Sequence, residues 1–421
     1  MACPFQPTAR LLAIYFLGGM ACLPALGADW PRWRGPELDG ISHESELLRT
    51  WPQGGPPQLW NAKLSGGFAA VVVADGKLFT QTKEKNQEVV VCLEAATGKE
   101  IWRYRYDCDY AAHPTFTGGG MPASRTGPRA TPAVDDGRIY TMGATGTLLC
   151  LETKTGKKIW QQDLLKLAGR TCPTHGYCGS PLVVGERIYL ELGGSEGKAV
   201  AALNKKDGSV IWQALDDTLG QASPIWAEVQ GVPQVIFFTG KAAVGVAPQD
   251  GKLLWRYPWT TRFDLNIATP IYAGGKVFIS SNYGTGGAVF RLTDQAEPET
   301  LWKSLAMQNH ISTSVLYQGH LYGFSDQRLR CVAFDTGKVC WDKIGLGKGT
   351  LTIADGNLII LGDHGQLVLA KPNPAEFTEI SRCQVFDQGT LTWTVPVVSD
   401  GRLFIRSENA LVALNLRIQT N

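Results

Sequence analysis

The sequence lacks an excess of charge of either sign. Its 421 residues include 40 Lys and Arg and 38 Asp and Glu, which leaves a formal net charge of +2. Basic side chains are interleaved with acidic ones along the chain, so no basic stripe is offered to a nucleic acid or to an anionic membrane surface. We therefore expect no nucleic-acid partner.

The short motifs that identify many enzymes are also missing. There is no G-x-S-x-G, no H-E-x-x-H and no P-loop, and the six histidines are scattered without metal-ligand spacing. The acidic pairs Asp135–Asp136 and Asp216–Asp217 fall in turns or loops, and the first is followed by Gly137, as in a tight hairpin. We predict no catalytic residues and no metal ligands, which favours a non-enzymatic protein.

Long helical patterns are absent as well. No convincing amphipathic segment of about 10 residues or more separates the apolar runs, so an alternating βαβ fold is excluded. After residue 28 no apolar run is long enough to cross a bilayer. We expect an all-β protein without a transmembrane span in its mature chain.

Residues 1–28 have the pattern of a secretion signal. Arg10 precedes the apolar segment Leu11–Leu26, and small residues up to Ala28 offer a cleavage site. Two glycines and a proline interrupt the apolar run, which argues against a membrane anchor. Cys22 follows Gly-Met-Ala, a poor lipoprotein acceptor, so lipidation at Cys22 is the alternative to simple cleavage. The segment predicts an exported protein, periplasmic or associated with the cell envelope.

Ten cysteines are present, of which Cys3 and Cys22 fall in this segment. Three others, at 92, 150 and 331, recur at one position of a repeated module, as buried apolar residues do. Cys172 and Cys178 are the best candidates for a local disulfide, and two free thiols are the alternative. Only His175 lies near them, so a metal site is not expected there.

Glycine and tryptophan, in contrast, are abundant, with 48 and 13 residues. They belong to a recurring module: Ser/Thr-Pro, an apolar strand, a Gly turn, two further strands, Thr-Gly-Lys or Asp-Gly, and a closing strand with Trp. The copies run from Ala70 to Trp102, Thr131 to Trp160, Ser180 to Trp212, Ser223 to Trp255, Thr269 to Trp302, Thr313 to Trp341 and, without the Trp, Thr350 to Arg382.

The last copy, Val395–Leu416, holds only three strands, and residues 57–64 (PQLWNAKL) supply the missing fourth. Pairing the two ends closes a ring and leaves no open sheet edge. We predict an all-β, eight-bladed β-propeller of four-stranded antiparallel blades at 57–418, preceded by a lead-in segment at 29–56. Its structural blade tryptophans are Trp60, Trp102, Trp160, Trp212, Trp255, Trp302 and Trp341.

The T-G-K-x-x-W endings, with Ser/Thr-Pro opening the next sheet, resemble the pyrroloquinoline-quinone (PQQ) repeat family of exported propellers. The similarity spans about residues 29–418. The family includes BamB-like propellers of outer-membrane protein assembly and quinoprotein dehydrogenases, so the resemblance implies architecture more than activity. Its enzymes hold PQQ against an adjacent Cys pair beside Ca²⁺. This chain has no adjacent Cys pair, and only Asp264 and Asn266 match part of a calcium site.

The residues just before each Ser/Thr-Pro should surround one mouth of the channel. They predict a ligand-binding set of Arg129, Tyr177, Gln221, Asn266, His310, Lys348 and Trp393. This set suits an anionic or polar ligand, with Trp393 as a stacking surface; a solvated channel without a ligand is the alternative. Two insertions, at 104–127 and 161–176, are expected over the same face, as binding lips or as plugs.

Two functions follow from these patterns. The first is a non-catalytic binding or scaffolding propeller of the bacterial cell envelope, whose narrower form is protein–protein interaction in outer-membrane protein assembly. It requires no cofactor, and its partner is an envelope protein or a small polar ligand. The alternative is a dehydrogenase of alcohols or sugars that depends on PQQ and Ca²⁺.

Overall fold

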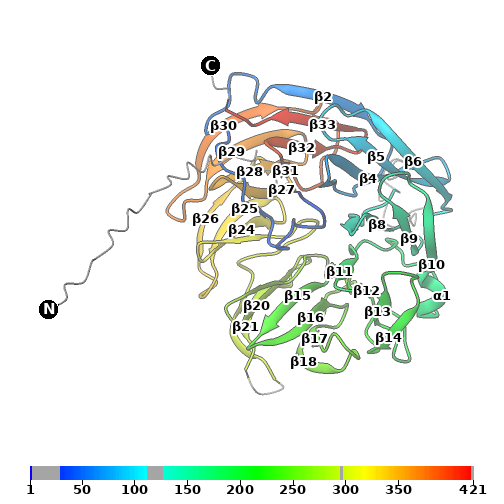
Figure 1. Cartoon of the computed structure of the whole chain (residues 1–421). Coiled ribbons are helices and arrows are strands. Elements are labelled where there is room, and N and C mark those ends of the chain that lie inside the picture. Colours follow the sequence, from blue (N-terminus) through cyan, green and yellow to red (C-terminus); the bar gives the residue numbers. More distant parts are fainter. Residues whose placement is uncertain (2–28, 111–126, 294–296, 419–421) are drawn as a thin grey trace.

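The computed structural model describes Met1 and residues 29–110, 127–293 and 297–418. The predicted signal segment, with Cys22, lies outside the described residues apart from Met1. The described strands form eight sheets that are arranged around a central channel, and each sheet has four antiparallel strands, with one parallel addition (Figure 1). The predicted eight-bladed propeller is thereby confirmed.

Each blade takes four strands, counted outward from the channel. Blade one contains β3 (Val72–Ala74), β4 (Lys77–Glu84), β5 (Gln87–Glu94) and β6 (Glu100–Asp107). Blade two contains β7 (Ala133–Asp135), β8 (Arg138–Met142), β9 (Thr147–Glu152) and β10 (Lys158–Asp163). Blade three contains β11 (Leu182–Val184), β12 (Arg187–Glu191), β13 (Val200–Asn204) and β14 (Val210–Ala214). Blade four contains β15 (Ile225–Val229), β16 (Val232–Phe238), β17 (Ala242–Val246) and β18 (Leu253–Pro258).

The second half repeats this order. Blade five contains β19 (Ile271–Ala273), β20 (Lys276–Ser281), β21 (Gly286–Arg291) and β22 (Glu299–Ser304). Blade six contains β23 (Val315–Tyr317), β24 (His320–Ser325), β25 (Arg328–Ala333) and β26 (Val339–Lys343). Blade seven contains β27 (Thr350–Ala354), β28 (Asn357–Leu361), β29 (Gln366–Lys371) and β30 (Thr378–Gln384). Blade eight contains β31 (Val397–Ser399), β32 (Arg402–Arg406), β33 (Ala410–Asn415) and, from the N-terminal side, β2 (Gln58–Lys63).

The two ends of the propeller meet in blade eight, as predicted. β2 pairs antiparallel with β33, with Trp60 opposite Ala413 and Lys63 opposite Ala410. In Figure 1 the blue strand β2 lies beside the red strand β33. This pairing supplies the fourth strand of blade eight and fixes the blade count at eight.

The outer-strand tryptophans dock onto the next blade. Trp102 Nε1 donates to the Thr153 carbonyl at 2.9 Å, and a Cβ atom on Gly156 would lie 2.6 Å from the Trp102 ring. Gly156 has a φ of +72°, so the Gly of Thr-Gly-Lys serves both the turn and the indole contact. The same donation to the next blade is made by Trp60, Trp160, Trp212, Trp302 and Trp341.

Trp255 departs from this pattern. Its Nε1 donates to Gln234 Oε1 of its own blade at 2.7 Å, and its ring packs edge-on against Phe290 of blade five. The sequence shows why, since blade five has no Thr-Gly-Lys or Asp-Gly before its last strand to receive the indole.

Blade seven, which lacks a Trp of its own, receives one from the lead-in segment. Ser381 lies opposite Leu369, the register position that Trp341 holds opposite Cys331 in blade six. The backbone N–H of Trp51 donates to Ser381 Oγ at 2.9 Å. The Trp51 side chain is buried in the apolar cluster between blades seven and eight.

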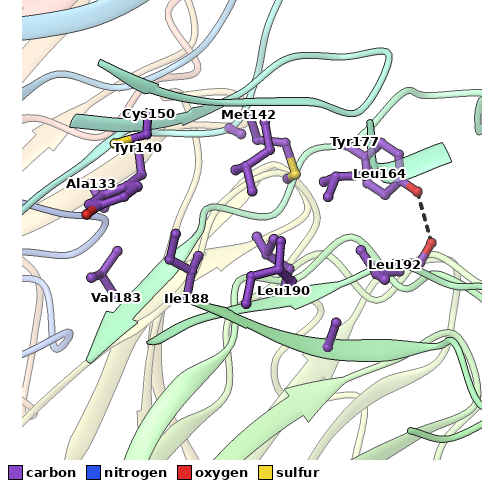
Figure 2. Packing of buried hydrophobic residues seen from close by; sticks show 14 of the residues in the cluster. Ala133, Tyr140, Met142, Cys150, Leu164, Tyr177, Val183, Ile188, Leu190 and Leu192 are labelled. Carbon is purple, nitrogen blue, oxygen red and sulfur yellow. Dashed lines mark hydrogen bonds between the residues drawn. The ribbon is translucent and has the colours of Figure 1, made fainter. Parts of the chain in front are cut away.

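Apolar side chains of neighbouring blades fill the space between the sheets. Figure 2 shows the cluster between blades two and three, where Tyr140 and Met142 face Ile188 and Leu190. The short helix α1 (Leu164–Ala168) covers its outer end. Among the described residues, no helix has the length and hydropathy needed to cross a bilayer.

Candidate functional site

The channel has two distinct ends. The innermost strands of blades two to five begin just after Ser/Thr-Pro, and those of the other blades begin at or just after the equivalent position. All of them end at a tight turn such as Asp75-Gly76 or Asp400-Gly401. We call the end where these strands begin the mouth face and the end with the Asp-Gly turns the far face. The connections between blades therefore lie on the mouth face.

The lead-in segment closes the channel from the far face. Five consecutive residues, Trp30–Arg34, contact five different blades. Trp30 pairs with Val73 of blade one, and the Pro31 carbonyl accepts the N–H of Val134 in blade two. Arg32 Nη1 donates to the Val183 carbonyl of blade three, Trp33 Nε1 donates to Thr269 Oγ1 of blade five, and Arg34 Nη1 donates to the Ser314 carbonyl of blade six. Strand β1 (Ile41–Ser42) then pairs parallel with β27 of blade seven. Glu44 accepts from the backbone of Asp400 and Gly401 in blade eight.

Arg34 is the buried centre of this plug. Its Nε donates to the Leu38 carbonyl at 2.9 Å and its Nη2 to the Asp39 carbonyl at 2.6 Å. Burial lowers the pKa of Arg34 to about 10, which leaves it charged near neutral pH. The charged Arg34 side chain therefore holds residues 34–39 in a compact turn and joins them to blade six. The lead-in segment packs as part of the propeller.

On the mouth side of the plug lies a cavity of about 250 Å³. Trp33 lines it together with the apolar side chains of Phe68, Leu265, Ile267, Ile311 and Trp393. The rings of Phe68 and Trp393 pack with their centroids 5.0 Å apart. Arg129 is its one charged lining residue near neutral pH, and the described lining includes no Asp or Glu. The cavity is apolar in body and positive in charge.

A ring of hydroxyl groups surrounds this cavity and joins neighbouring blades. The oxygens of Thr131, Ser180, Ser223 and Thr313 each accept a backbone N–H from the preceding blade, with the donors Ala70, Thr131, Ser180 and Thr269 at 2.9 to 3.2 Å. Thr269 Oγ1 accepts the Trp33 indole N–H at 2.8 Å. All five hydroxyl residues line the cavity. The Ser/Thr of the repeat is therefore an inter-blade acceptor.

A chain of polar groups reaches the cavity from blades five to seven. Lys348 Nζ lies 3.2 Å from Asp326 Oδ1 and 3.2 Å from His310 Nδ1. His310 Nε2 lies 2.9 Å from the hydroxyl of Tyr283, which lines the cavity. Burial, with a smaller contribution from Lys348, lowers the pKa of His310 to about 4, so its imidazole is neutral near pH 7.

The opposite side of the cavity carries Arg129 and His175. Arg129 Nη1 donates to the His175 carbonyl at 2.9 Å. Burial and the nearby Arg129 lower the pKa of His175 as well.

The predicted mouth residues divide into two groups. Arg129, Gln221, His310 and Trp393 line the cavity together. Tyr177 and Asn266 do not: the Tyr177 ring lies between blades two and three with its hydroxyl on the Leu192 carbonyl (Figure 2), and the Asn266 amide donates to the Thr239 carbonyl and accepts from Ser281. Lys348 reaches the cavity only through His310.

Gln221 is held by a buried carboxyl group. Glu191 accepts the N–H of Gly220 at 2.6 Å and that of Gln221 at 3.2 Å. The Gln221 side chain then bridges Cys178 N–H and the Gly176 carbonyl, which fixes the loop that carries His175. Burial raises the pKa of Glu191 to about 8, although its two N–H donors favour the ionised form.

The suggested Cys172–Cys178 disulfide is not formed in the structure. Both are free thiols, with Cys172 Sγ 3.7 Å from the Ala144 carbonyl and Cys178 Sγ 3.6 Å from that of His175. The insertion at 161–176 contributes His175 to the cavity lining. Of the insertion at 104–127, residues 111–126 lie outside the described residues.

Four exposed apolar side chains lie on the mouth-face loops of blades four to seven. Phe263 follows β18 and packs edge-on against Tyr283 with the centroids 5.2 Å apart. Leu305 and Ile344 begin the next two connections and are 57% and 63% exposed. The other large exposed apolar side chains of the described ranges lie on outer strands or at turns and chain ends away from this face. This group, Phe263, Tyr283, Leu305 and Ile344, is called the mouth patch below.

Comparison with known proteins places this geometry in a family. A family model described as outer membrane protein assembly factor BamB matches residues 49–127 and 119–343. The chain belongs to this family. The BamB of Moranella endobia is 26% identical over 258 residues, which cover 57% of this chain and 63% of that protein.

Enzymes with the same repeat are also similar to part of the chain. The quinoprotein alcohol dehydrogenase PedH of Pseudomonas putida is 27% identical over 212 residues, which cover 44% of this chain and 33% of PedH. The crystal structure of BamB from Moraxella catarrhalis superposes with a TM-score of 0.60 at 14% identity and covers 86% of this chain and 99% of that one. At this identity the superposition shows the fold alone.

Proposed function

We propose that this protein is a non-catalytic scaffold of the bacterial cell envelope that binds another protein through its mouth face and takes part in outer-membrane protein assembly, as its BamB relatives are named to do. The observation that carries the proposal is the mouth patch. Phe263, Leu305 and Ile344 lie on three consecutive connections between blades, and Tyr283 lies on the β20–β21 hairpin of blade five. These four side chains leave apolar surface exposed on one face of the closed ring, and such patches favour contact with another protein. The plugged far face offers no comparable opening.

The arrangement around the patch also supports protein binding. Phe263 and Tyr283 present aromatic rings, which are enriched at the centres of interfaces. Arg262 lies over the Phe263 ring at 5.2 Å, and the Lys348–Asp326 ion pair connects to Tyr283 through His310. An apolar centre with a charged border is the arrangement found in transient protein–protein interfaces.

Photo-cross-linking from defined positions tests this function. A benzophenone amino acid replaces Ile344 or Leu305 in the protein expressed in its native host, and the matched control replaces Ile159, which is 44% exposed on outer strand β10. We expect a discrete adduct with an outer-membrane assembly protein from the two mouth positions and none from position 159. Equal adducts from all three positions, or no adduct, would contradict docking at the mouth face. Mouth-specific adducts with unrelated proteins only would retain the scaffold and refute the assembly role.

The alternative, a dehydrogenase that depends on PQQ and Ca²⁺, fits the side chains less well. Asp264 is paired with Lys241 and accepts from Thr218, and both side-chain atoms of Asn266 are engaged in hydrogen bonds. The described residues contain no group of three or more His, Cys, Asp or Glu placed to hold a metal ion. A calcium site needs about 6–8 oxygen ligands, and we derive no catalytic step from this donor set.

A further inference from the structure

Among the described residues, the hydroxyl groups of this ring have no hydrogen-bond acceptor for their own protons. A hydroxyl that accepts an N–H still has its own O–H to donate. Within the described ranges, the side chains of Thr131, Ser180, Ser223, Thr269 and Thr313 act as acceptors only. Because all five line one cavity, its wall presents hydrogen-bond donors.

Tyr283 adds a further donor by elimination. An ammonium group has no acceptor, so Lys348 must donate to His310 Nδ1. The neutral imidazole then carries its proton on Nε2 and donates it to the Tyr283 oxygen. The hydroxyl proton of Tyr283 is consequently left for a group inside the cavity.

The charge of the cavity agrees with its donors. Arg129 lines it, Lys348 lies one residue behind the wall, and the lining includes no carboxylate among the described residues. Donors and a cation in an otherwise apolar enclosure favour a ligand with acceptor oxygens and negative charge, since hydrogen bonds to a charged group are the stronger ones.

The apolar part of the lining indicates the size and the apolar character of that ligand. The aromatic rings of Trp33, Phe68 and Trp393 and the side chains of Ile267 and Ile311 enclose most of the space. A dry cavity of about 150 Å³ already binds benzene in a protein core, so about 250 Å³ accommodates one or two fused rings. A polyanion would meet only one lining cation.

From these contacts we propose that the channel cavity is a binding site for a small aromatic monocarboxylate, whose ring lies against Trp33 and the Phe68–Trp393 pair and whose carboxylate takes hydrogen bonds from Arg129, Tyr283 and the hydroxyl ring. This site goes beyond the protein docking proposed above and uses the interior of the channel. Its ligand enters from the mouth face, because the lead-in closes the other end.

Titration of the purified protein with 2-naphthoate and with the neutral 2-naphthylmethanol tests the site. Calorimetry and tryptophan fluorescence should report saturable 1:1 binding of the carboxylate, about 10-fold or more tighter than that of the alcohol. Tyr283→Phe keeps the aromatic ring and removes one hydrogen-bond donor, and Arg129→Gln removes the cation. Each substitution should weaken the binding of 2-naphthoate by about 10-fold or more and leave the affinity for the alcohol unchanged.

Two controls separate this result from general effects. Tyr272→Phe removes a hydroxyl that donates to the Glu228 carbonyl outside the cavity, and Arg105→Gln removes an exposed cation on β6; both should bind 2-naphthoate like the wild type. Equal affinity for carboxylate and alcohol, insensitivity to both cavity variants, or saturation by PQQ with Ca²⁺ while 2-naphthoate fails to bind would overturn the proposal. None of these outcomes bears on cross-linking from Ile344, so the two proposals fail separately.

Discussion

At the scale of single residues, the packing of each loop decides which side chains reach the cavity. Aligning the repeats brought Arg129, Gln221, His310 and Trp393 to one place, because equivalent positions in a propeller share a radius. The same alignment misplaced Tyr177, whose ring is drawn between blades two and three by the Leu192 carbonyl, and Asn266, whose amide ties two turns together. Local sequence does not show which side of a loop a side chain takes.

The sequence does not show that the Ser/Thr of the repeat and Trp33 contribute to the cavity. In the sequence the Ser/Thr of the repeat is visible only as a marker of each copy, because its contact with the neighbouring blade involves two residues that are far apart in the chain. Trp33 lies in a stretch without strand alternation, so nothing local places it at the floor of the channel. A hydroxyl residue repeated at one register of blades two to six is the signal that could have revealed the ring.

Glu191 gives a pH prediction at this scale. Its pKa is raised by burial to about 8 in the fold, above the ordinary value near 4.3, so the folded state binds the proton more tightly. The stability that this proton contributes is complete below about pH 4 and is lost as the pH rises through about 8. We expect the wild-type melting temperature to fall over this range.

The Glu191→Gln variant isolates that dependence. It should melt at a temperature that changes less between about pH 5 and pH 8, and Glu228→Gln on the exposed face of β15 should follow the wild type. Parallel pH profiles of wild type and Glu191→Gln would show that Glu191 does not titrate in this way.

At the scale of elements, the lead-in segment replaces what the repeats lack. Trp51 occupies the space between blades seven and eight, where no outer-strand Trp is present. Trp51→Ala should lower the free energy of unfolding by about 3–5 kcal/mol, as for a buried Trp elsewhere. Urea unfolding measures this loss, and Ile418→Ala, at an exposed position, should change it by less than about 0.5 kcal/mol. If Trp51→Ala lowered the free energy of unfolding as little as the control does, Trp51 would not be taking the structural place of the Trp that blade seven lacks.

The plug makes its own prediction through two amides. Val134 N–H donates to the Pro31 carbonyl at 2.7 Å and Ile353 N–H to the Gly40 carbonyl at 3.1 Å. In a variant that lacks residues 29–40, both amides should exchange with deuterium about 10-fold faster or more, because they lose their acceptors and face an open channel. The amide of Ile139 on the central strand β8 should keep its rate. Unchanged exchange at all three positions would mean that the lead-in does not fill the channel.

At the scale of the whole molecule, the sequence is sufficient to predict the closed ring but not the plug and the cavity inside it. Strand order, blade count and closure follow from the repeat period and from a Trp-bearing strand left over at the N-terminal end. The plug, the cavity above it and the mouth patch arise where residues 30–44 and the inter-blade connections depart from the repeat, and these departures carry the proposed functions.

Closure of the ring between β2 and β33 is the claim on which the mouth face, the plug and the cavity all depend. Disulfide trapping with Lys63→Cys and Ala410→Cys, which are paired across the two strands, tests it by peptide mapping of the oxidised protein. The structure predicts a cross-link between positions 63 and 410 in high yield. None should form between Lys63→Cys and Asn415→Cys, since Asn415 lies about 17 Å along β33 from Ala410. Equal yields for the two pairs, or no cross-link from either, would contradict the closed eight-bladed ring.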